Sequence, residues 1–280
     1  MPDVTRHCTV SALVGDTAPG VARPEADGAR VRHAPASATT GEWLSRAPRL
    51  RVLEEDPDLA GGLSDEDRES AVKAAVAPVY ILRRGPWSLL PEPDPSSLGA
   101  LILDGLIAVR IDSGSRAHLE LLGPGDVISP WVGMGPDLAL AAKVTTLVVS
   151  PVRIALLDRD FALRSARWPQ IAAALAHRLV IRGRRLSLQA AINSLPRTLE
   201  RVELTLWMQA YRFGRVTNRG HVVHLPISHF QLAALVAATR PSVSVSLSRL
   251  QRTGRLVRAD NHIWILTGSP PRGLGGQPLL

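Results

Sequence analysis

The residues whose chemistry is easiest to interpret lie between 226 and 266, where hydroxyl side chains and arginines alternate with apolar positions. In the segment ISHFQLAALVAATRPSVSVSLSRL, Ser228 can cap one helix and Pro241 can occupy the first turn of a second. Apolar residues spaced by four and three form one face of that second helix: Val243, Leu247 and Leu250. This pattern predicts a helix-turn-helix with a polar, basic outer face.

The outer face of the second helix carries side chains that suit the major groove of DNA. Arg240 can donate two hydrogen bonds to guanine O6 and N7, and Val245 can touch a thymine methyl group. Other polar residues are expected to reach phosphates, which fixes the register without reading sequence: Ser228, Ser242, Arg249, Arg252, Arg258, Asn261 and His262. Residues 226–266 are therefore predicted to bind double-stranded DNA.

Two further features support a nucleic-acid partner. The β runs 255–258 and 262–266 bend around residues 259–261, as in the wing of a winged helix. Residues 151–280 hold 19 Lys and Arg against 5 Asp and Glu, whereas residues 1–150 hold 14 against 20. The alternative is an ordinary solvated basic surface.

The middle of the chain shows the alternation of apolar and polar residues that is typical of antiparallel strands. Two apolar runs flank Asp104 and Gly105, a pair that predicts a tight hairpin turn. Two more strands are expected over 143–149 and 152–157. A short helix should precede them, with Ser64 as its N-cap and acidic residues in its first turn. Together these elements predict a compact barrel or jelly roll.

A helical period begins near Arg159 and continues to Asn193, interrupted only by Pro169. Along it, small and apolar residues recur at intervals of four and three, which is the heptad pattern of a coiled-coil seam. The residues of this seam are Ala172, Ala176, Leu179, Gly183, Leu186 and Ala190. We expect the seam to pair with a second copy in a parallel homodimer. The alternative is that it packs against the chain's own barrel.

Composition excludes several classes of protein. No uninterrupted apolar run reaches the roughly 18 residues that a membrane span needs, and the N-terminal residues lack the apolar core of a signal peptide, so we expect a cytoplasmic protein without a membrane partner. The single cysteine, Cys8, excludes an intrachain disulfide. No nucleophile–base pair and no phosphate-cradling glycine loop is recognisable, so no enzymatic activity is expected.

The order of these parts resembles the Crp/Fnr transcription regulators. The resemblance covers about residues 50–268 and is most specific in the strands that end in LGPGD and in the helix TRPSVSVSLSRL. It implies an α+β fold: an N-terminal antiparallel jelly roll, a long dimerisation helix and a C-terminal winged helix-turn-helix. The expected regions are a disordered extension over 1–48, a cyclic-nucleotide-binding-like sensor over 49–158, a dimerisation helix over 159–194, a winged helix-turn-helix over 195–268 and a flexible tail over 269–280.

The resemblance also implies how the chain would act. A homodimer would bind a palindromic operator, with its two recognition helices one DNA turn apart, and would act on RNA polymerase. Arg240 stands at the guanine-reading position of the family, and Thr239 and Ser242 stand where phosphate contacts lie. Pro241 replaces the usual glutamate and Val245 replaces a residue that is often basic, so the family's base preference does not transfer. The alternative is a ligand sensor whose winged helix binds a protein such as RNA polymerase.

The sensor part departs from the cyclic-nucleotide members of the family. Their phosphate-binding cassette uses a Gly-Glu pair and an Arg-Ser pair, but the matching stretch 129–149 contains neither glutamate nor arginine. We therefore expect that cyclic AMP does not control this protein, although a cyclic-nucleotide-responsive regulator stays an alternative. The candidate lining of another effector pocket is Trp131, Asp137 and Lys143, and the effector itself stays unidentified.

The histidines of the C-terminal part are candidate metal ligands by residue type. His221, His224, His229 and His262 lie there without cysteine partners, so we expect no metal and no cofactor. His229 and His262 are expected to contact phosphates instead. A haem would need His118 or His177 as its axial ligand, which is the weaker interpretation.

Overall fold

A computed structural model describes residues 47–87, 96–113, 116–128, 143–260 and 262–271. All of them belong to one compact unit of the chain, Thr39–Leu280. The expected N-terminal extension lies outside the described residues except for its last two positions, and so does most of the expected tail.

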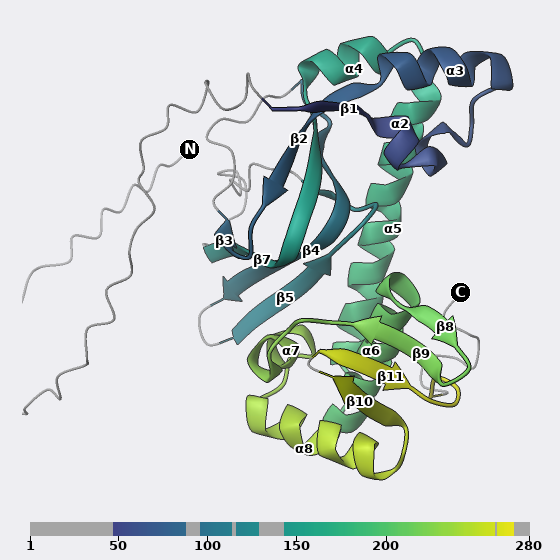
Figure 1. Ribbon diagram of the computed structural model, residues 1–280. Coiled ribbons are helices and arrows are strands. Elements are labelled where there is room, and N and C mark those ends of the chain that lie inside the picture. The colour runs from purple at the N-terminus through teal and green to yellow at the C-terminus, as the bar shows by residue number, and fades with distance from the viewer. Residues whose placement is uncertain (1–46, 88–95, 114–115, 129–142, 261, 272–280) are drawn as a thin grey trace, which may run out of the picture. The chain divides into compact units, whose positions relative to one another are not determined.

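An antiparallel sheet forms the first part of the described chain (Figure 1). Its strands are β1 (Arg49–Arg51), β2 (Val76–Leu82), β3 (Gly85–Trp87), β4 (Gly99–Ser113), β5 (Arg116–Leu122), β6 (Val127–Ile128) and β7 (Lys143–Leu157). They follow the order β1-β2-β7-β4-β5, with β3 paired to β7 and β6 paired to β4. One core of this part contains Ile102, Ile107 and Leu122, which are fully buried. The mixture of helices and antiparallel sheet confirms the expected α+β class.

The predicted hairpin at Asp104 and Gly105 is wrong, because β4 runs through both residues as one strand. Its pairing with β7 is irregular there and skips Gly105. Gly105 has φ +84°, and a Cβ at this position would collide with the carbonyl group of Pro151. The glycine therefore serves a β-bulge at the closest approach of two long strands instead of a chain reversal.

The two strands expected over 143–149 and 152–157 are likewise one strand, β7. Pro151 cannot donate a backbone hydrogen bond, and it lies opposite the bulge where the ladder is already broken. The Ser150 hydroxyl accepts a hydrogen bond from the amide of Leu106 at 2.9 Å, which restores pairing beside the bulge.

Short helices cover one end of the sheet: α2 (Val52–Glu55), the 3₁₀ helix η1 (Pro57–Ala60), α3 (Asp65–Ala74) and α4 (Arg159–Ser165). Ser64 caps α3 as predicted, since its hydroxyl accepts a hydrogen bond from the amide of Asp67 at 3.2 Å. The helix expected from Arg159 to Asn193 is in fact two helices, because α5 (Pro169–Asn193) begins anew after Trp168. A residue before proline is driven out of the helical region, and the buried Trp168 indole fixes the break by donating to Asp67 at 3.1 Å.

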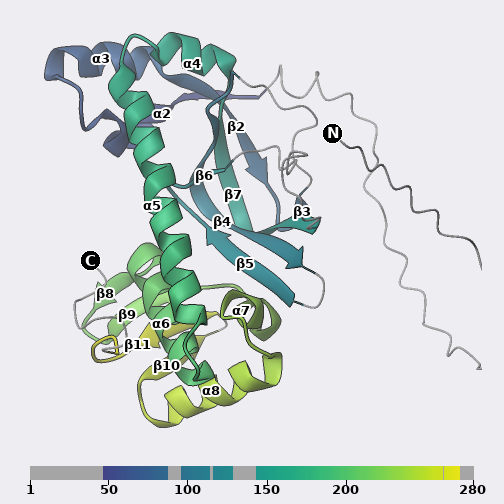
Figure 2. The same ribbon diagram turned by 180° about the vertical axis from the view of Figure 1, so that it is seen from behind.

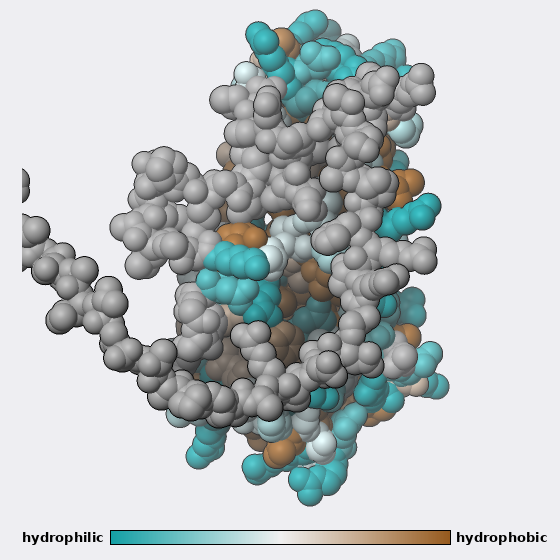
Figure 3. All heavy atoms as spheres, turned by 90° about the vertical axis from the view of Figure 1, so that its left-hand side faces the viewer, coloured by the Kyte–Doolittle hydropathy of each residue, from teal (hydrophilic) through white to brown (hydrophobic). Residues whose placement is uncertain are grey.

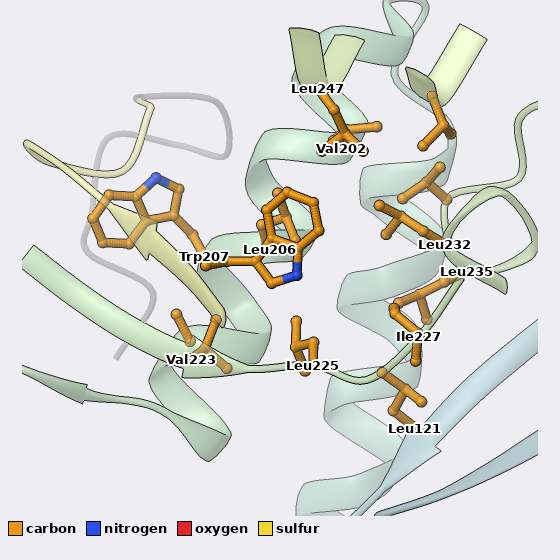
Figure 4. Packing of buried hydrophobic residues seen from close by; sticks show 14 of the residues in the cluster. Leu121, Val202, Leu206, Trp207, Val223, Leu225, Ile227, Leu232, Leu235 and Leu247 are labelled. Carbon is orange, nitrogen blue, oxygen red and sulfur yellow. The ribbon is translucent and has the colours of Figure 1, made fainter. Parts of the chain in front are cut away.

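The C-terminal part consists of α6 (Thr198–Phe213), β8 (Arg215–Thr217), β9 (Gly220–His224), α7 (His229–Leu235), α8 (Arg240–Arg252), β10 (Leu256–Asp260) and β11 (Ile263–Leu266). Its antiparallel strands follow the order β10-β11-β9-β8. The predicted wing is present as β10 and β11. Figure 4 shows the core between these elements, with Trp207 at its centre and 1% exposed.

This core continues into the barrel. Leu119 and Leu121 of β5 belong to the same buried cluster as Leu232 and Leu235 of α7. In Figure 4, Leu121 faces Ile227 and Leu235. The winged part therefore shares a hydrophobic core with the outer face of the sheet.

Candidate nucleic-acid interface

Helices α7 and α8 are positioned by caps that the sequence encodes locally. Ser228 and Gln231 form a reciprocal capping box at the start of α7. At the start of α8, the Thr239 hydroxyl lies 2.9 Å from the Ser242 hydroxyl and 3.4 Å from the Ser242 amide nitrogen. Ala237 closes the turn between the two helices with φ 49°. The predicted helix-turn-helix is thus built from short polar caps and a tight turn.

Long polar side chains from α5 and α6 hold this turn in place. The sequence analysis did not predict these contacts. Arg201 of α6 donates to the carbonyl oxygens of Val236 and Ala237 at 3.2 and 2.8 Å. Gln189 and Asn193 of α5 donate to the carbonyl oxygen of Leu235 at 3.1 and 3.2 Å. Long polar side chains thereby satisfy the free carbonyl groups at the end of α7.

One side of α8 is packed into the core, and the other is exposed. Val243, Leu247 and Leu250 are buried as predicted, and the opposite side of the helix is exposed. The exposed residues there are Arg240, Pro241, Val245, Ser248, Arg249 and Arg252. Figure 3 shows hydrophilic side chains gathered at the end of the molecule that α8 forms.

His229 has a different environment from the one expected of a free phosphate contact. Its Nδ1 lies 3.0 Å from the Ser244 hydroxyl, so it links α7 to α8. Burial lowers its pKa below the ordinary value of 6.5, and the nearby Arg258 and Arg240 lower it further. The imidazole is therefore neutral at pH 7 and works as a hydrogen-bonding link beside the arginines.

The wing brings further cations to the same side. Arg258 of β10 lies over the ring of the buried Trp264, 5.5 Å from the ring centroid. His262 lies immediately before β11 with φ 74°, and its carbonyl oxygen accepts a hydrogen bond from the amide of Leu225 at 2.9 Å. Burial lowers the pKa of His262, with smaller contributions from His224, Arg258 and Arg84. Asn261 lies outside the described residues.

The predicted seam on α5 is exposed along its whole length. The side chain of Leu179 is 50% exposed, that of Leu186 is 37% exposed, and Gly183 faces open space. Ala172, Ala176 and Ala190 are exposed as well. Figure 2 shows the outward side of α5 without another described element against it. The alternative that this stripe packs on the chain's own barrel is therefore wrong.

The opposite side of α5 binds the barrel through arginines. Arg178 pairs with Asp56 at 2.6 Å, and Arg182 forms a two-pronged pair with Glu120 at 2.8 Å. The hydrogen bonds to Glu120 raise the pKa of Arg182. These charge-assisted contacts and the buried Ile171 and Leu175 hold this side of α5 against the rest of the chain and leave the other side exposed.

A buried carboxylate joins α5, α6 and the barrel. Asp126 is 3% exposed and pairs with Arg185 of α5 at 2.5 Å and with Arg212 of α6 at 2.6 Å. It also accepts the amide of Gly123 at 2.9 Å. Burial lowers the pKa of Arg212 to about 10, partly offset by the charge of Asp126, so the guanidinium stays protonated at neutral pH. We call Asp126, Arg185 and Arg212 the carboxylate clamp.

The C-terminal part of this geometry matches a known domain. Residues 200–267 match the Crp-like helix-turn-helix domain family. The chain therefore contains a Crp-like helix-turn-helix domain, which is its DNA-binding domain. No curated protein sequence matches the chain.

Solved structures share the fold of this chain at low sequence identity. FixK2 from Bradyrhizobium japonicum is 18% identical with a TM-score of 0.53, covering 69% of this chain and 93% of its own. A cyclic nucleotide-binding domain containing protein from Listeria monocytogenes EGD-e is 17% identical with a TM-score of 0.56, covering 75% and 97%. TTHB099, a CRP-family transcriptional regulator from Thermus thermophilus, is 20% identical with a TM-score of 0.51, covering 67% and 92%.

The candidate effector residues are placed only in part. Trp131 and Asp137 lie outside the described residues, and Lys143 is exposed at the start of β7. A cavity of about 680 Å³ lies elsewhere, between the barrel and the first turn of α8, and its lining includes Arg110 and Phe230. The Arg110 guanidinium lies 5.2 Å from the centroid of the Phe230 ring. Sequence reasoning missed this cavity because its walls come from distant segments.

Within the part of the chain that the structure describes, no three His, Cys, Asp or Glu side chains are grouped as ligands for a metal ion. No helix among the described residues is both long and apolar enough to cross a bilayer.

Proposed function

We propose that this chain is a Crp/Fnr-type transcription regulator that acts as a homodimer and binds a palindromic operator through α8 and the wing. The observation that carries the proposal is the free outer face of α8, where Arg240 and Arg249 are exposed on a helix whose other side is packed into the core. A recognition helix enters the major groove with its N-terminal residues at the base edges, and Arg240 is the first residue of α8.

The roles within the interface follow from chemistry and position. Arg240 would read a guanine by two hydrogen bonds. Ser228, Thr239 and Ser242 lie at the N-terminal ends of α7 and α8, where helix amides favour phosphate. Arg249, Arg252 and His262 would extend the phosphate contacts, together with Asn261, which lies outside the described residues. His229 would support them through Ser244.

The exposed stripe on α5 supports the dimer. Leu179 and Leu186 lie seven residues apart on it, and Gly183 between them leaves room for a close approach of two backbones. Pairing of the stripe with itself would bury the apolar surface that α5 exposes in the single chain. Two copies related in this way would present two α8 helices to a palindrome.

We further propose that operator binding does not require cyclic AMP. The protein would act on RNA polymerase at its promoters through binding alone, without catalysing a chemical reaction. The support for the first statement is the sequence 129–149, which has no glutamate for a ribose hydroxyl and no arginine for a cyclic phosphate.

The test is selection of bound sequences from a random DNA pool with the full chain, at moderate salt, with and without cyclic AMP. A palindromic sequence enriched without nucleotide supports the proposal. Enrichment only with cyclic AMP overturns the nucleotide-independent part, and no enrichment in either condition overturns operator binding.

A matched pair of variants separates operator recognition from general basicity. Arg240→Ala removes the proposed guanine contact, and we expect binding to the selected sequence to fall to the level of unrelated DNA. Arg219→Ala removes an exposed arginine in the turn between β8 and β9, outside the proposed interface, and should leave the preference intact. Unchanged sequence preference in Arg240→Ala would favour a protein partner for the winged domain.

A further inference from the structure

An apolar patch occupies the middle of the face that the proposed function assigns to DNA. Pro241, Val245 and Arg249 are four residues apart, so their side chains lie in one row along α8. Val245 is 66% exposed, and Pro241 is exposed one turn before it. Neither side chain can donate or accept a hydrogen bond.

Two of the hydroxyl groups near this patch are engaged within the protein, and Ser248 is the exposed hydroxyl beside it. The Ser244 hydroxyl is engaged with His229 at 3.0 Å. The Ser246 hydroxyl donates to the backbone carbonyl of Ser242 at 2.8 Å, inside the helix. The sequence of α8, RPSVSVSLSRLQR, contains no carboxylate, so the helix has no acidic acceptor for the amino group of cytosine.

In the major groove, the base-edge group that gains most from an apolar neighbour is the C5-methyl of thymine. We propose that Val245, supported by Pro241, reads the methyl group of one thymine in each half-site and thereby determines specificity. This inference rests on the proposed function, because it requires α8 to lie in the major groove.

The spacing along α8 also locates the thymine. Val245 lies five residues after Arg240, which corresponds to about 7.5 Å along the helix axis. Base pairs are stacked about 3.4 Å apart, so a helix lying along the groove would place the thymine about two base pairs from the guanine that Arg240 contacts. The half-site therefore combines a guanine read by hydrogen bonds with a nearby thymine read by its methyl group.

The test uses the operator obtained by selection, with each thymine replaced in turn by deoxyuracil. This replacement removes the methyl group and keeps the base pair. Burial of one methyl group corresponds to about a fourfold change in affinity, so we expect about fourfold weaker binding for one half-site and about 15-fold for both. The loss of affinity should be confined to one thymine per half-site. This thymine should lie near the guanine whose replacement no longer weakens binding by Arg240→Ala.

Two variants assign the effect to the side chain. Val245→Ala should bind the thymine and the deoxyuracil operators equally well, and its exposed position leaves the core unchanged. Ser248→Ala, on the same side of α8, should keep the preference for thymine. Circular dichroism of both variants checks that α8 is folded.

The outcomes distinguish this inference from the proposed function. An operator on which every thymine tolerates deoxyuracil overturns the reading of methyl groups while operator binding stands. A thymine preference that survives in Val245→Ala overturns the assignment to this residue. Failure to select any operator overturns the proposed function and this inference with it.

Discussion

Replacement of Asp126 by alanine should strongly destabilise the fold, because it leaves two guanidinium groups facing a vacated site. In the native chain the carboxylate is 3% exposed and accepts from Arg185, Arg212 and the amide of Gly123. The Arg212 side chain is 14% exposed and would stay charged without its partner. Removal of one partner from a buried ion pair costs about 3–5 kcal/mol, and we expect a loss in that range.

The assay is urea denaturation of the full chain at neutral pH, with the free energy of unfolding as the readout. Asp112→Ala is the matched control, because Asp112 pairs with Arg110 at 2.7 Å but both side chains are about one-third exposed, at 30% and 33%. A solvent-screened pair of this kind contributes little, so Asp112→Ala should lower the free energy of unfolding far less than Asp126→Ala. Equal losses in Asp126→Ala and Asp112→Ala would refute the argument that burial makes the clamp costly to break.

A second variant tests the cause of the loss. Adding Arg212→Leu to Asp126→Ala removes an unpaired buried charge, so the double variant should recover part of the stability. A further loss in the double variant would mean that the Arg212 contact with the carbonyl oxygen of Leu121, at 3.0 Å, outweighs the charge.

Three more predictions concern other parts of the chain. Leu179→Glu should shift the chain toward the monomer in analytical ultracentrifugation, and a dimer that persists in this variant contradicts the seam. Leu163→Glu, which changes a 65% exposed leucine on α4, should leave the oligomeric state unchanged. Gly105→Ala should lower the free energy of unfolding by more than the roughly 1–2 kcal/mol that a left-handed backbone costs, because the new Cβ would meet a carbonyl group of β7. Gly254→Ala, at a position with φ +69° and open space around it, should show the backbone cost alone. Because burial and two arginines hold the pKa of His229 below 6.5, the folded chain takes up fewer protons than the unfolded chain, and its stability should fall as the pH drops below 6.5. His229→Gln should make that fall shallower, and an identical pH profile in this variant would contradict the role of His229.

Local signals predicted the helix caps and the elements of the C-terminal part well. Ser64 and Ser228 could be identified as caps because a hydroxyl before an apolar helical period has one main role. The core side of α8 followed from the spacing of Val243, Leu247 and Leu250, and the wing from two short β runs around a turn. These features depend on residues within a few positions of one another.

Features that depend on distant residues could not be predicted in this way. The Asp104–Gly105 pair has the local signature of a hairpin, yet tertiary pairing with Pro151 and its neighbours turns it into a bulge. The clamp joins Asp126 to Arg212, 86 residues later, and nothing near either residue marks the partner. The heptad on α5 showed which residues form a stripe, but only the arginine contacts of the opposite face show that this stripe is left free.

The hydrophobic core that Leu121 shares with Leu235 has a consequence for how the protein can be divided. A fragment that contains only the residues after the barrel would expose to water the apolar side of α7 that β5 covers in the full chain. This exposure costs about 25 cal/mol for each Å². The winged domain is therefore not a detachable module in this chain. Strain introduced into β5 would therefore reach α7, the helix that immediately precedes α8.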